Sequence, residues 1–164
     1  MDGLSIVALS AEDASRLAAH LLRLCPADRS LRFAAGLVTD ETIRRYVAGI
    51  RFATDAVLGL VDAQGSVVGF AHGCVYSSGG RTHIEAAFSV DAERRRLGFG
   101  TRLMRAVESF AEDTGADALV GICVSRNLPM RRIFERTGMT MSREDDEMHA
   151  FRRLDAARCE AAFA

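Results

Sequence analysis

The sequence lacks lysine and tryptophan, and it contains only two prolines and two tyrosines. All 21 basic residues are therefore arginines, which we attribute to genome composition because nothing in folding forbids lysine. No apolar run approaches the roughly 20 residues that a membrane-spanning helix needs. The start, Met1-Asp2-Gly3, lacks the positive stretch that opens a signal peptide. These absences predict a cytoplasmic protein with no membrane partner.

Neither sign of charge dominates, since the net charge is −1 at pH 7. A nearly neutral chain has no general attraction to nucleic acid or anionic lipid, so neither is expected as a partner. Cysteine pairs of the C-x-x-C kind are also missing, and the neighbouring histidines lack zinc-ligand spacing. We therefore expect no metal, and we expect buried, reduced thiols at Cys25, Cys74, Cys123 and Cys159.

What the chain does have is the composition of a folded domain. Hydrophobic residues make up 49% of it and charged residues 26%, a balance typical of globular rather than disordered proteins. A length of 164 residues suits one domain with a substantial core. No internal repeat or low-complexity linker interrupts the sequence. We expect residues 1–164 to form a single domain.

Hydrophobic periodicity and turn residues predict alternating strands and helices. Leu17, Leu21 and Leu24 follow the cap residue Ser10 at helical spacing, and Pro26 is expected to end that helix. The expected strands are 4–9, 56–62, 67–76, 82–90, 119–124, 140–142 and 148–154, and further helices are expected from about 39, after the glycines near 100, and from 129 to 138. The order is β-α-α-β-β-β-α-β-α-β-β, with one right-handed strand–helix–strand crossover from 82 to 124. This order predicts a mixed α/β fold.

A glycine-rich segment, 90–101, runs from the end of a predicted strand into the start of a predicted helix. Backbone N–H groups at a helix start have no partner within the helix, and the helix dipole favours anions there. Gly98 and Gly100 carry no side chains that would keep phosphate oxygens from the backbone. Three consecutive arginines, 94–96, add positive charge. The segment therefore predicts a site for a phosphate-bearing ligand.

Two common phosphate-binding patterns do not fit this segment. A Rossmann fingerprint needs a third glycine where the chain has Leu103. A P-loop needs a Gly-Lys-Ser/Thr sequence, and the chain has no lysine. Nucleotide binding through the glycine loop is therefore disfavoured.

The pattern Arg95-x-x-Gly98-x-Gly100 after a strand resembles the pyrophosphate-binding signature of GNAT N-acetyltransferases, whose co-substrate is acetyl-CoA. A later segment, 127–139, resembles that family's second signature, in which an asparagine precedes a helix and a glycine follows it. The resemblance covers 82–139 and implies the GNAT fold, an α/β fold with a twisted mixed central sheet and helices on both faces. One departure is Ala92, where many relatives have proline.

By this resemblance, three segments would hold the cofactor. The strand end is expected to pair with the pantetheine arm through its main chain, and the glycine loop is expected to cradle the pyrophosphate. The second signature is expected to lie near the far end of the cofactor. The cofactor-binding residues implied are Phe88, Ser89, Val90, Arg95, Arg96, Leu97, Gly98, Phe99, Gly100, Thr101, Asn127, Met130 and Arg131.

The strand 84–90 is similar to the Ala-Glu-x-Ala-Phe-x-Val strand of bacterial Pat-type protein lysine acetyltransferases. Segments 24–33, 127–131 and 143–145 are also similar to that group. This resemblance implies that Glu85 is the general base, taking the proton that an amine such as lysine carries at neutral pH. The N-terminal helices and a loop, 26–39, are expected to form the acceptor's entrance. The residues expected to contact substrate are Arg29, Arg32 and Phe33.

Phe134 stands where many GNAT enzymes have the tyrosine that protonates the leaving thiolate. A phenyl ring has no proton to give, so water or Ser125 is expected to help instead. His72 and His83 are candidates for a proton relay or for ordinary core and surface positions. The sequence predicts an N-acetyltransferase that acts on a primary amine, with a protein lysine and a small molecule both open as acceptors. A non-catalytic acyl-CoA-binding module is the alternative, and a homodimer is left open.

Overall fold

The computed structural model of the protein describes residues 3–154, and over this range it contains seven strands and five α-helices. The strands are β1 (Ser5–Ala8), β2 (Ala56–Val61), β3 (Val67–Ser78), β4 (Arg81–Val90), β5 (Ala118–Val124), β6 (Thr140–Glu144) and β7 (Glu147–Arg153). The helices are α1 (Ala14–Arg23), α2 (Pro26–Phe33), α3 (Asp40–Ala48), α4 (Phe99–Asp113) and α5 (Leu128–Arg136). Two 3₁₀ turns, η1 (Ala11–Asp13) and η2 (Ala92–Arg94), precede α1 and α4. None of the helices described has the length and apolar character needed to pass through a bilayer.

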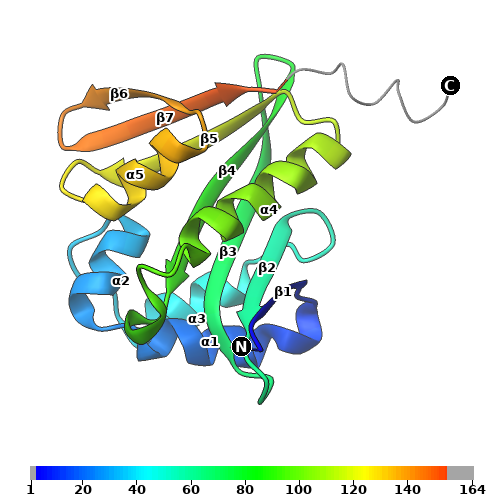
Figure 1. Ribbon diagram of the computed structural model, residues 1–164, viewed down its shortest axis with the longest axis vertical. Helices are drawn as coiled ribbons and strands as arrows, with labels where there is room; N and C mark the ends of the chain where they lie inside the picture. Colours follow the sequence, from blue (N-terminus) through cyan, green and yellow to red (C-terminus); the bar gives the residue numbers. More distant parts are fainter. Residues whose placement is uncertain (1–2, 155–164) are drawn as a thin grey trace, which may run out of the picture.

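All seven strands belong to one sheet, in the order β1-β2-β3-β4-β5-β7-β6 (Figure 1). β4 and β5 are parallel, while the other neighbouring strands run antiparallel. Parallel neighbours cannot be joined by a tight turn, so α4 forms the crossover between them. The sheet is therefore mixed, as the sequence predicted, and the start of α4 follows directly from the end of β4.

Helices cover both faces of the sheet, and a hydrophobic core lies under each set. Ile84 of β4 and Leu103 of α4 belong to the core that also takes in α5. On the opposite face, Leu17 of α1 and Ile43 of α3 share a core with Phe70 of β3. Figure 1 shows α4 and α5 in front of the sheet and α1 and α3 behind it.

The helices α1 and α3 begin close to the positions that the sequence predicted, and the structure adds one helix between them. Ser10 forms a capping box with Asp13, and Thr39 caps α3. The sequence predicts a loop over 26–39, but the structure contains α2, which begins at Pro26. Proline suits the first position of a helix because its missing N–H would have no helical partner there. Pro26 therefore follows one helix and starts the next.

β4 and β5 separate halfway along their lengths. Their paired positions are His83–Ala118, Ile84–Leu119 and Glu85–Val120. β4 continues to Val90 while paired with β3, and β5 continues to Val124 while paired with β7. Among the residues that the structure describes, the facing edges of the two strands have no strand partner beyond Glu85 and Val120. An opening in the sheet therefore begins there and runs towards the start of α4.

The cysteines do not all show the burial expected of them. Cys123 is buried and Cys74 half-buried, but Cys25 is exposed, and all three are free thiols. Cys159 lies outside the described residues. Burial raises the pKa of the Cys123 thiol to about 11, so this side chain is protonated at neutral pH.

Candidate functional site

A groove of about 680 Å³ occupies the opening between β4 and β5 and continues to the N-terminus of α4. Helix α2 lies against it, since α2 contacts both β4 and β5. The residues lining the groove are Leu24, Asp28, Leu31, Arg32, Ala87, Phe88, Ser89, Val90, Arg94, Arg95, Arg96, Gly98, Phe99, Gly100, Thr101, Ile122, Cys123, Asn127, Pro129, Met130, Arg132, Ile133 and Arg136. Of the residues that the sequence assigned to a cofactor, all but Leu97 and Arg131 line this groove.

The glycine loop leaves backbone amides without protein partners at the end of the groove. Gly98 is the N-cap of α4 and has a left-handed φ of 81°, and a Cβ on it would meet no atom within 4 Å. The first hydrogen bond of the helix runs from the N–H of Arg102 to the carbonyl of Gly98. The amides of 99–101 therefore have no helical partner. Several free N–H groups at the positive end of a helix dipole suit a pyrophosphate.

Gly100 lines the groove, as expected of a cofactor-binding residue, and it also lies close to α5. A Cβ at this position would come within 2.7 Å of the Cδ1 atom of Ile133 on α5. The close approach of α4 and α5 is therefore a second reason for glycine at this position, besides room for a phosphate.

The side chain of Arg95 links the loop to α2 instead of standing free for a phosphate. Its Nη2 lies 2.8 Å from Oδ2 of Asp28, and its Nε donates to the carbonyl of Val90 over 3.0 Å. The hydrogen bond from Arg95 lowers the pKa of Asp28 despite partial burial, so the carboxylate is charged at neutral pH. Arg94 and Arg96 also line the groove, and within the described residues neither forms an ion pair. These two are the freer cations of the loop.

The β4 residues assigned to the cofactor offer the groove their backbone. Phe88 and Val90 pack against the hydrophobic core. The hydroxyl of Ser89 lies 2.8 Å from Nε2 of His20, a fully buried histidine of α1. Nδ1 of His20 lies 2.8 Å from the carboxylate of Asp91. With the side chains engaged elsewhere, the unpaired backbone edge of β4 is what remains for a ligand.

The second signature segment lies only partly in the groove. Asn127 lines it and caps α5 through its Oδ1, which accepts a hydrogen bond from the helix backbone over 3.2 Å. Arg131 turns away and donates to the carbonyl of Ser125 over 3.2 Å. Arg132 and Arg136, which sequence reasoning missed, face the groove one turn apart. A helix rotates about 100° per residue, and the motif alone did not fix which of two adjacent arginines faces inward.

Glu85 lies at the closed end of the opening, at the last position where β4 pairs with β5. Its side chain is half-buried and lies on the face opposite Ile84 and Ala86, as strand alternation predicts. Ala87 begins the groove on the same face as Glu85, about 7 Å along the strand. A water molecule can span much of that distance, so the carboxylate can serve the inner end of the groove without lining it.

A row of rings borders Glu85 on its own face of the sheet. The ring of His83 lies 5.3 Å from that of Tyr76 and 6.4 Å from that of Phe151, measured between centroids. Tyr76 and Phe151 are among the exposed large hydrophobic residues. Burial and the nearby charge of Glu85 raise the pKa of Tyr76. Ring faces beside a carboxylate suit an alkylammonium group.

Of the three α2 residues assigned to substrate, only Arg32 lines the groove. Arg29 donates to three backbone carbonyls and pairs with Asp40 at 2.8 Å, so the expected substrate contact does not agree with its geometry. Phe33 packs edge-on against Tyr46, with ring centroids 5.2 Å apart. Both residues therefore support α2 from behind the groove.

His72 is held at both ring nitrogens, so it is not free to relay protons from a substrate. Its Nδ1 lies 2.7 Å from the hydroxyl of Tyr46, and its Nε2 lies 2.9 Å from the buried carboxylate of Asp55. Burial lowers the pKa of His72, although Asp55 opposes the shift. Asp55, His72 and Cys74 have ligand atoms within 4.8 Å of one another. Arg51 already donates to Asp55 and Cys74, and we assign no metal to this group.

Phe134 lies outside the groove and is fully buried. Its ring packs on Gly121 of β5, where a Cβ would come within 2.4 Å of Cε1. Ser125, the other residue considered for protonation of the thiolate, does not line the groove either. Water is therefore left as the expected proton source.

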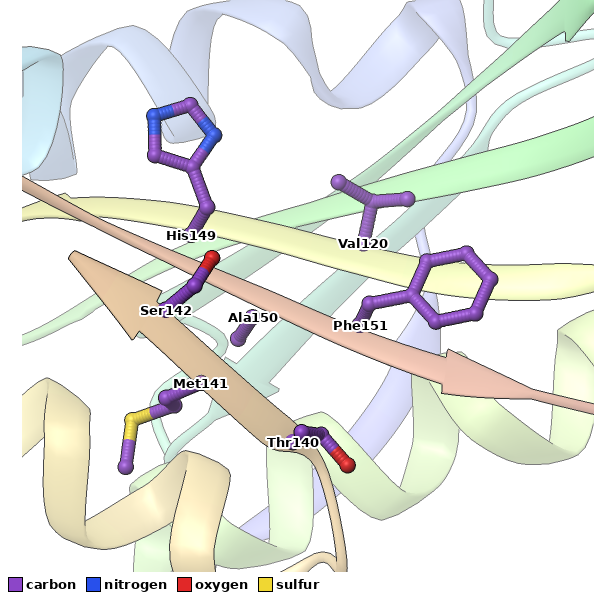
Figure 2. A pocket seen from close by; sticks show the side chains of 7 residues that line it. All are labelled: Val120, Thr140, Met141, Ser142, His149, Ala150 and Phe151. Carbon is purple, nitrogen blue, oxygen red and sulfur yellow. The ribbon is translucent and has the colours of Figure 1, made fainter. Parts of the chain in front are cut away.

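A second hollow, of about 410 Å³, lies at the β6–β7 hairpin beside β5 (Figure 2). Its lining residues are Val120, Thr140, Met141, Ser142, His149, Ala150 and Phe151. Figure 2 shows the side chains of Val120 and His149 on one face of the sheet and those of Met141 and Ala150 on the other. Because this second hollow follows the edge of the sheet across both of its faces, we place the candidate site in the groove between β4 and β5.

A model of the acetyltransferase (GNAT) family matches residues 37–139, which is more than half of the chain. Among curated protein sequences, none matches. Similar solved structures include the GNAT domain of S. lividans PAT, with 19% identity and a TM-score of 0.76 over 91% of this chain and 89% of that one.

Two further similar structures come from Sinorhizobium meliloti and Vibrio fischeri. The phosphinothricin acetyltransferase from S. meliloti, in complex with AcCoA, has 13% identity and a TM-score of 0.73 over 93% of this chain and 89% of that one. The ribosomal-protein-S5-alanine acetyltransferase from V. fischeri has 11% identity and a TM-score of 0.73 over 94% and 95%. At such identities the likeness shows the fold alone, and it confirms the GNAT fold expected from the sequence. Together with the family model, it establishes that the chain belongs to the acetyltransferase (GNAT) family.

Proposed function

We propose that the protein transfers the acetyl group of acetyl-CoA to a primary amine. The observation that carries this proposal is the groove between β4 and β5, which ends at the free amides of the glycine loop. The similar S. meliloti acetyltransferase was solved with AcCoA bound, which supports the same cofactor here.

In this proposal the cofactor lies along the groove with its thioester at the inner end. The pantetheine arm carries amide groups and pairs with the open backbone edge of β4 at 88–90. The pyrophosphate meets the amides at the start of α4, and Arg96 with Arg132 supplies nearby positive charge. Arg95 contributes indirectly, because its pair with Asp28 holds the loop against α2.

Glu85 is the proposed general base. An alkylamine is protonated at neutral pH and must lose a proton before its nitrogen can attack the thioester carbonyl carbon. Glu85 takes that proton through a water molecule, the new C–N bond forms, and the C–S bond breaks. The thiolate leaves and takes a proton from water, and the hydroxide left behind takes the second proton of the nitrogen as the amide forms. A thiol with a pKa near 8.5 is a tolerable leaving group, so the chemistry does not require a tyrosine in place of Phe134.

We favour a lysine side chain of another protein as the acceptor, with a small amine as the alternative. The likeness of the Glu85 strand to the Pat-type group supports the first, and the exposed rings of Tyr76 and Phe151 beside Glu85 suit a long alkylammonium arm. The phosphinothricin acetyltransferase among the similar structures represents the second. A cytoplasmic location and a homodimer stay predictions.

The Glu85→Gln variant tests the proposed function. We expect it to bind acetyl-CoA as the wild type does and to turn over roughly 10²–10⁴ times more slowly at neutral pH. The defect should shrink as pH rises, because more of the amine is then already neutral. Glu41→Gln, on the exposed surface of α3, is the matched control. Equal turnover by wild type and Glu85→Gln would exclude Glu85 as the base.

Labelled acetyl-CoA identifies the acceptor class. Incubation with a lysate of the source cells should label discrete proteins, and since the chain has no lysine, its own side chains give no lysine background. Label confined to metabolites of low mass would select the small-amine alternative. Acetyl-CoA binding without any turnover would instead favour the non-catalytic acyl-CoA-binding module.

A further inference from the structure

Arg32 is an arginine without a carboxylate partner in the wall of the groove. It lies in the last turn of α2, and its Nε is buried with no hydrogen-bond partner. Arg29 on the same helix pairs with Asp40, whereas Arg32 forms no ion pair with any residue that the structure describes. Its partner in the fold is the hydroxyl of Tyr46, which accepts a hydrogen bond from Nη2 over 2.9 Å.

Three aromatic rings surround the Arg32 guanidinium. Its Cζ atom lies 5.1 Å from the ring centroid of Phe33, 5.4 Å from that of Tyr46 and 5.7 Å from that of Phe70. Ring faces stabilise a cation but accept no strong hydrogen bonds, so some N–H groups of the guanidinium have no hydrogen-bond acceptor. The rings therefore fix a cation at this place without neutralising it.

A chain of hydrogen bonds runs from Arg32 through the core and has a single direction. Asp55 is ionised and can only accept, so Nε2 of His72 carries the proton that it donates. Nδ1 of the neutral ring must then accept from the hydroxyl of Tyr46, and that hydroxyl accepts from Arg32. The N–H of Val75 and the guanidinium of Arg51 also donate to Asp55. Each group is held by the next, which fixes the position of Arg32.

This arrangement lies beside the part of the groove that is lined by Ala87 and Ser89. His72 pairs in register with Ala87, and Phe70 with Ser89, two groove-lining positions beyond Glu85 on the same face of the sheet. Asp28, at the other end of α2, meets Arg95 at the glycine loop. Helix α2 thus runs from the phosphate end of the groove to the end where the acyl group and the amine would meet.

We propose that Arg32 is a carboxylate-binding site beside the reacting atoms, so that one of the two molecules joined there carries a carboxylate group. A half-buried cation without a counter-ion is costly, and a ligand carboxylate would both neutralise it and use its free N–H groups. The planar guanidinium matches the two oxygens of a carboxylate better than an ammonium group does. The carboxylate belongs either to the acyl chain of the thioester or to the acceptor, and this inference rests on the proposed acyl transfer.

Matched ligand pairs, in which one member has a carboxylate wherever the other has none, test the site by calorimetry. For the acyl chain, the pair is succinyl-CoA and acetyl-CoA. For the acceptor, the pairs are alanine and alaninamide, and capped Glu-Lys-Glu and Gln-Lys-Gln peptides, each titrated with and without coenzyme A. The proteins are the wild type, Arg32→Gln, Arg32→Lys and Arg45→Gln. Arg45 is exposed on α3, and its substitution removes the same charge at a distance from the groove.

We expect the wild type and Arg45→Gln to prefer the carboxylate-bearing member of one pair by on the order of 10-fold to 100-fold. Arg32→Gln should lose that preference while its affinity for the neutral member changes little, and Arg32→Lys should keep part of it. The pair that responds identifies the source of the carboxylate. Equal affinities within every pair for the wild type, or an unchanged preference in both Arg32 variants, would overturn the proposal.

Two failures stay distinct in this design. If the wild type binds no acyl-CoA thioester, the proposed function is wrong, and the titrations without coenzyme A still decide the role of Arg32. If acetyl-CoA binds and turns over but no pair is discriminated, the proposed function stands and the carboxylate site is wrong. Circular dichroism spectra check that each variant is folded. If Arg32→Gln does not fold, the preference for the carboxylate is compared between the wild type and Arg32→Lys.

Discussion

At the scale of single residues, Gly98 and Gly115 form a matched pair at the two ends of α4. Both have left-handed backbone, with φ of 81° and 69°, and a Cβ on either would meet no atom within 4 Å. An L-residue pays a conformational cost in this region whatever space is available. The two positions therefore share a backbone requirement, but only Gly98 lines the groove.

Alanine at these two positions separates backbone strain from cofactor contact. We expect Gly98→Ala and Gly115→Ala to lower the free energy of unfolding by a similar amount, roughly 1–2 kcal/mol. Gly98→Ala should also weaken acetyl-CoA binding by on the order of tenfold, because its methyl group stands beside amides expected to bind phosphate. Urea titration and calorimetry measure the two effects. A loss of affinity shared equally by Gly115→Ala would show that strain in α4, and not contact at Gly98, is responsible.

At the scale of elements, α2 and the glycine loop are joined by an ion pair across 67 residues of sequence. Asp28 begins the link in the first turn of α2, and Arg95 closes it while also binding the carbonyl of Val90. The loop is therefore ordered before a ligand arrives, which lowers the entropy that binding has to remove.

A double-mutant cycle measures this link. Asp28→Asn, Arg95→Gln and the double variant should give a coupling of about 0.5–1 kcal/mol in the free energy of unfolding, since both side chains are partly exposed. The coupling should decrease as salt is added, because solvent screens such a pair. Strictly additive effects of the two substitutions would mean that the pair does not hold the loop.

Local signals in the sequence were enough for most elements and for the location of the groove. Strand alternation placed Glu85 on the correct face, and α3 begins at Asp40, next to the start expected at about 39. Helix α2 was not predicted because Pro26 was interpreted only as the end of the preceding helix. The residues after it show little helical spacing of apolar side chains that would have indicated a second helix. The links from Asp28 to Arg95 and from Arg32 to Asp55 could not be predicted, since each joins segments that only the folded chain brings together.

At the scale of the whole molecule, the binding of protons at three buried groups favours the unfolded chain. Burial lowers the pKa of His72 from its ordinary 6.5. Burial acts to raise the pKa values of Asp55 and Asp91, but hydrogen bonds from histidine and other donors outweigh it, so both lie below 3.8. In each case the unfolded chain binds the proton more readily than the folded protein does, so protonation favours unfolding.

The free energy of unfolding should therefore fall in two stages as pH decreases. The first decline begins below pH 6.5, where His72 takes a proton in the unfolded chain alone, and the second begins near pH 4, where the aspartates do the same. Within each stage the slope is about 1.4 kcal/mol per pH unit for each proton. Urea titrations across this range measure it. His72→Gln should remove the first stage and reduce the part of the second stage that comes from Asp55, because His72 helps to lower the pKa of that carboxyl. Stability that rises from pH 7 towards pH 5 would contradict the prediction.

The separation of β4 and β5 leaves one edge of each strand without a strand partner, along 86–90 and 121–124. A cofactor arm bound there would take the place of that partner, so the supply of the cofactor becomes part of what keeps the protein folded. At a ligand concentration 100 times its Kd, the gain is about 2.7 kcal/mol. Limited proteolysis should then slow as acetyl-CoA is added. In a cell, the lifetime of a protein stabilised in this way would follow the abundance of the acyl-CoA that we propose as its co-substrate.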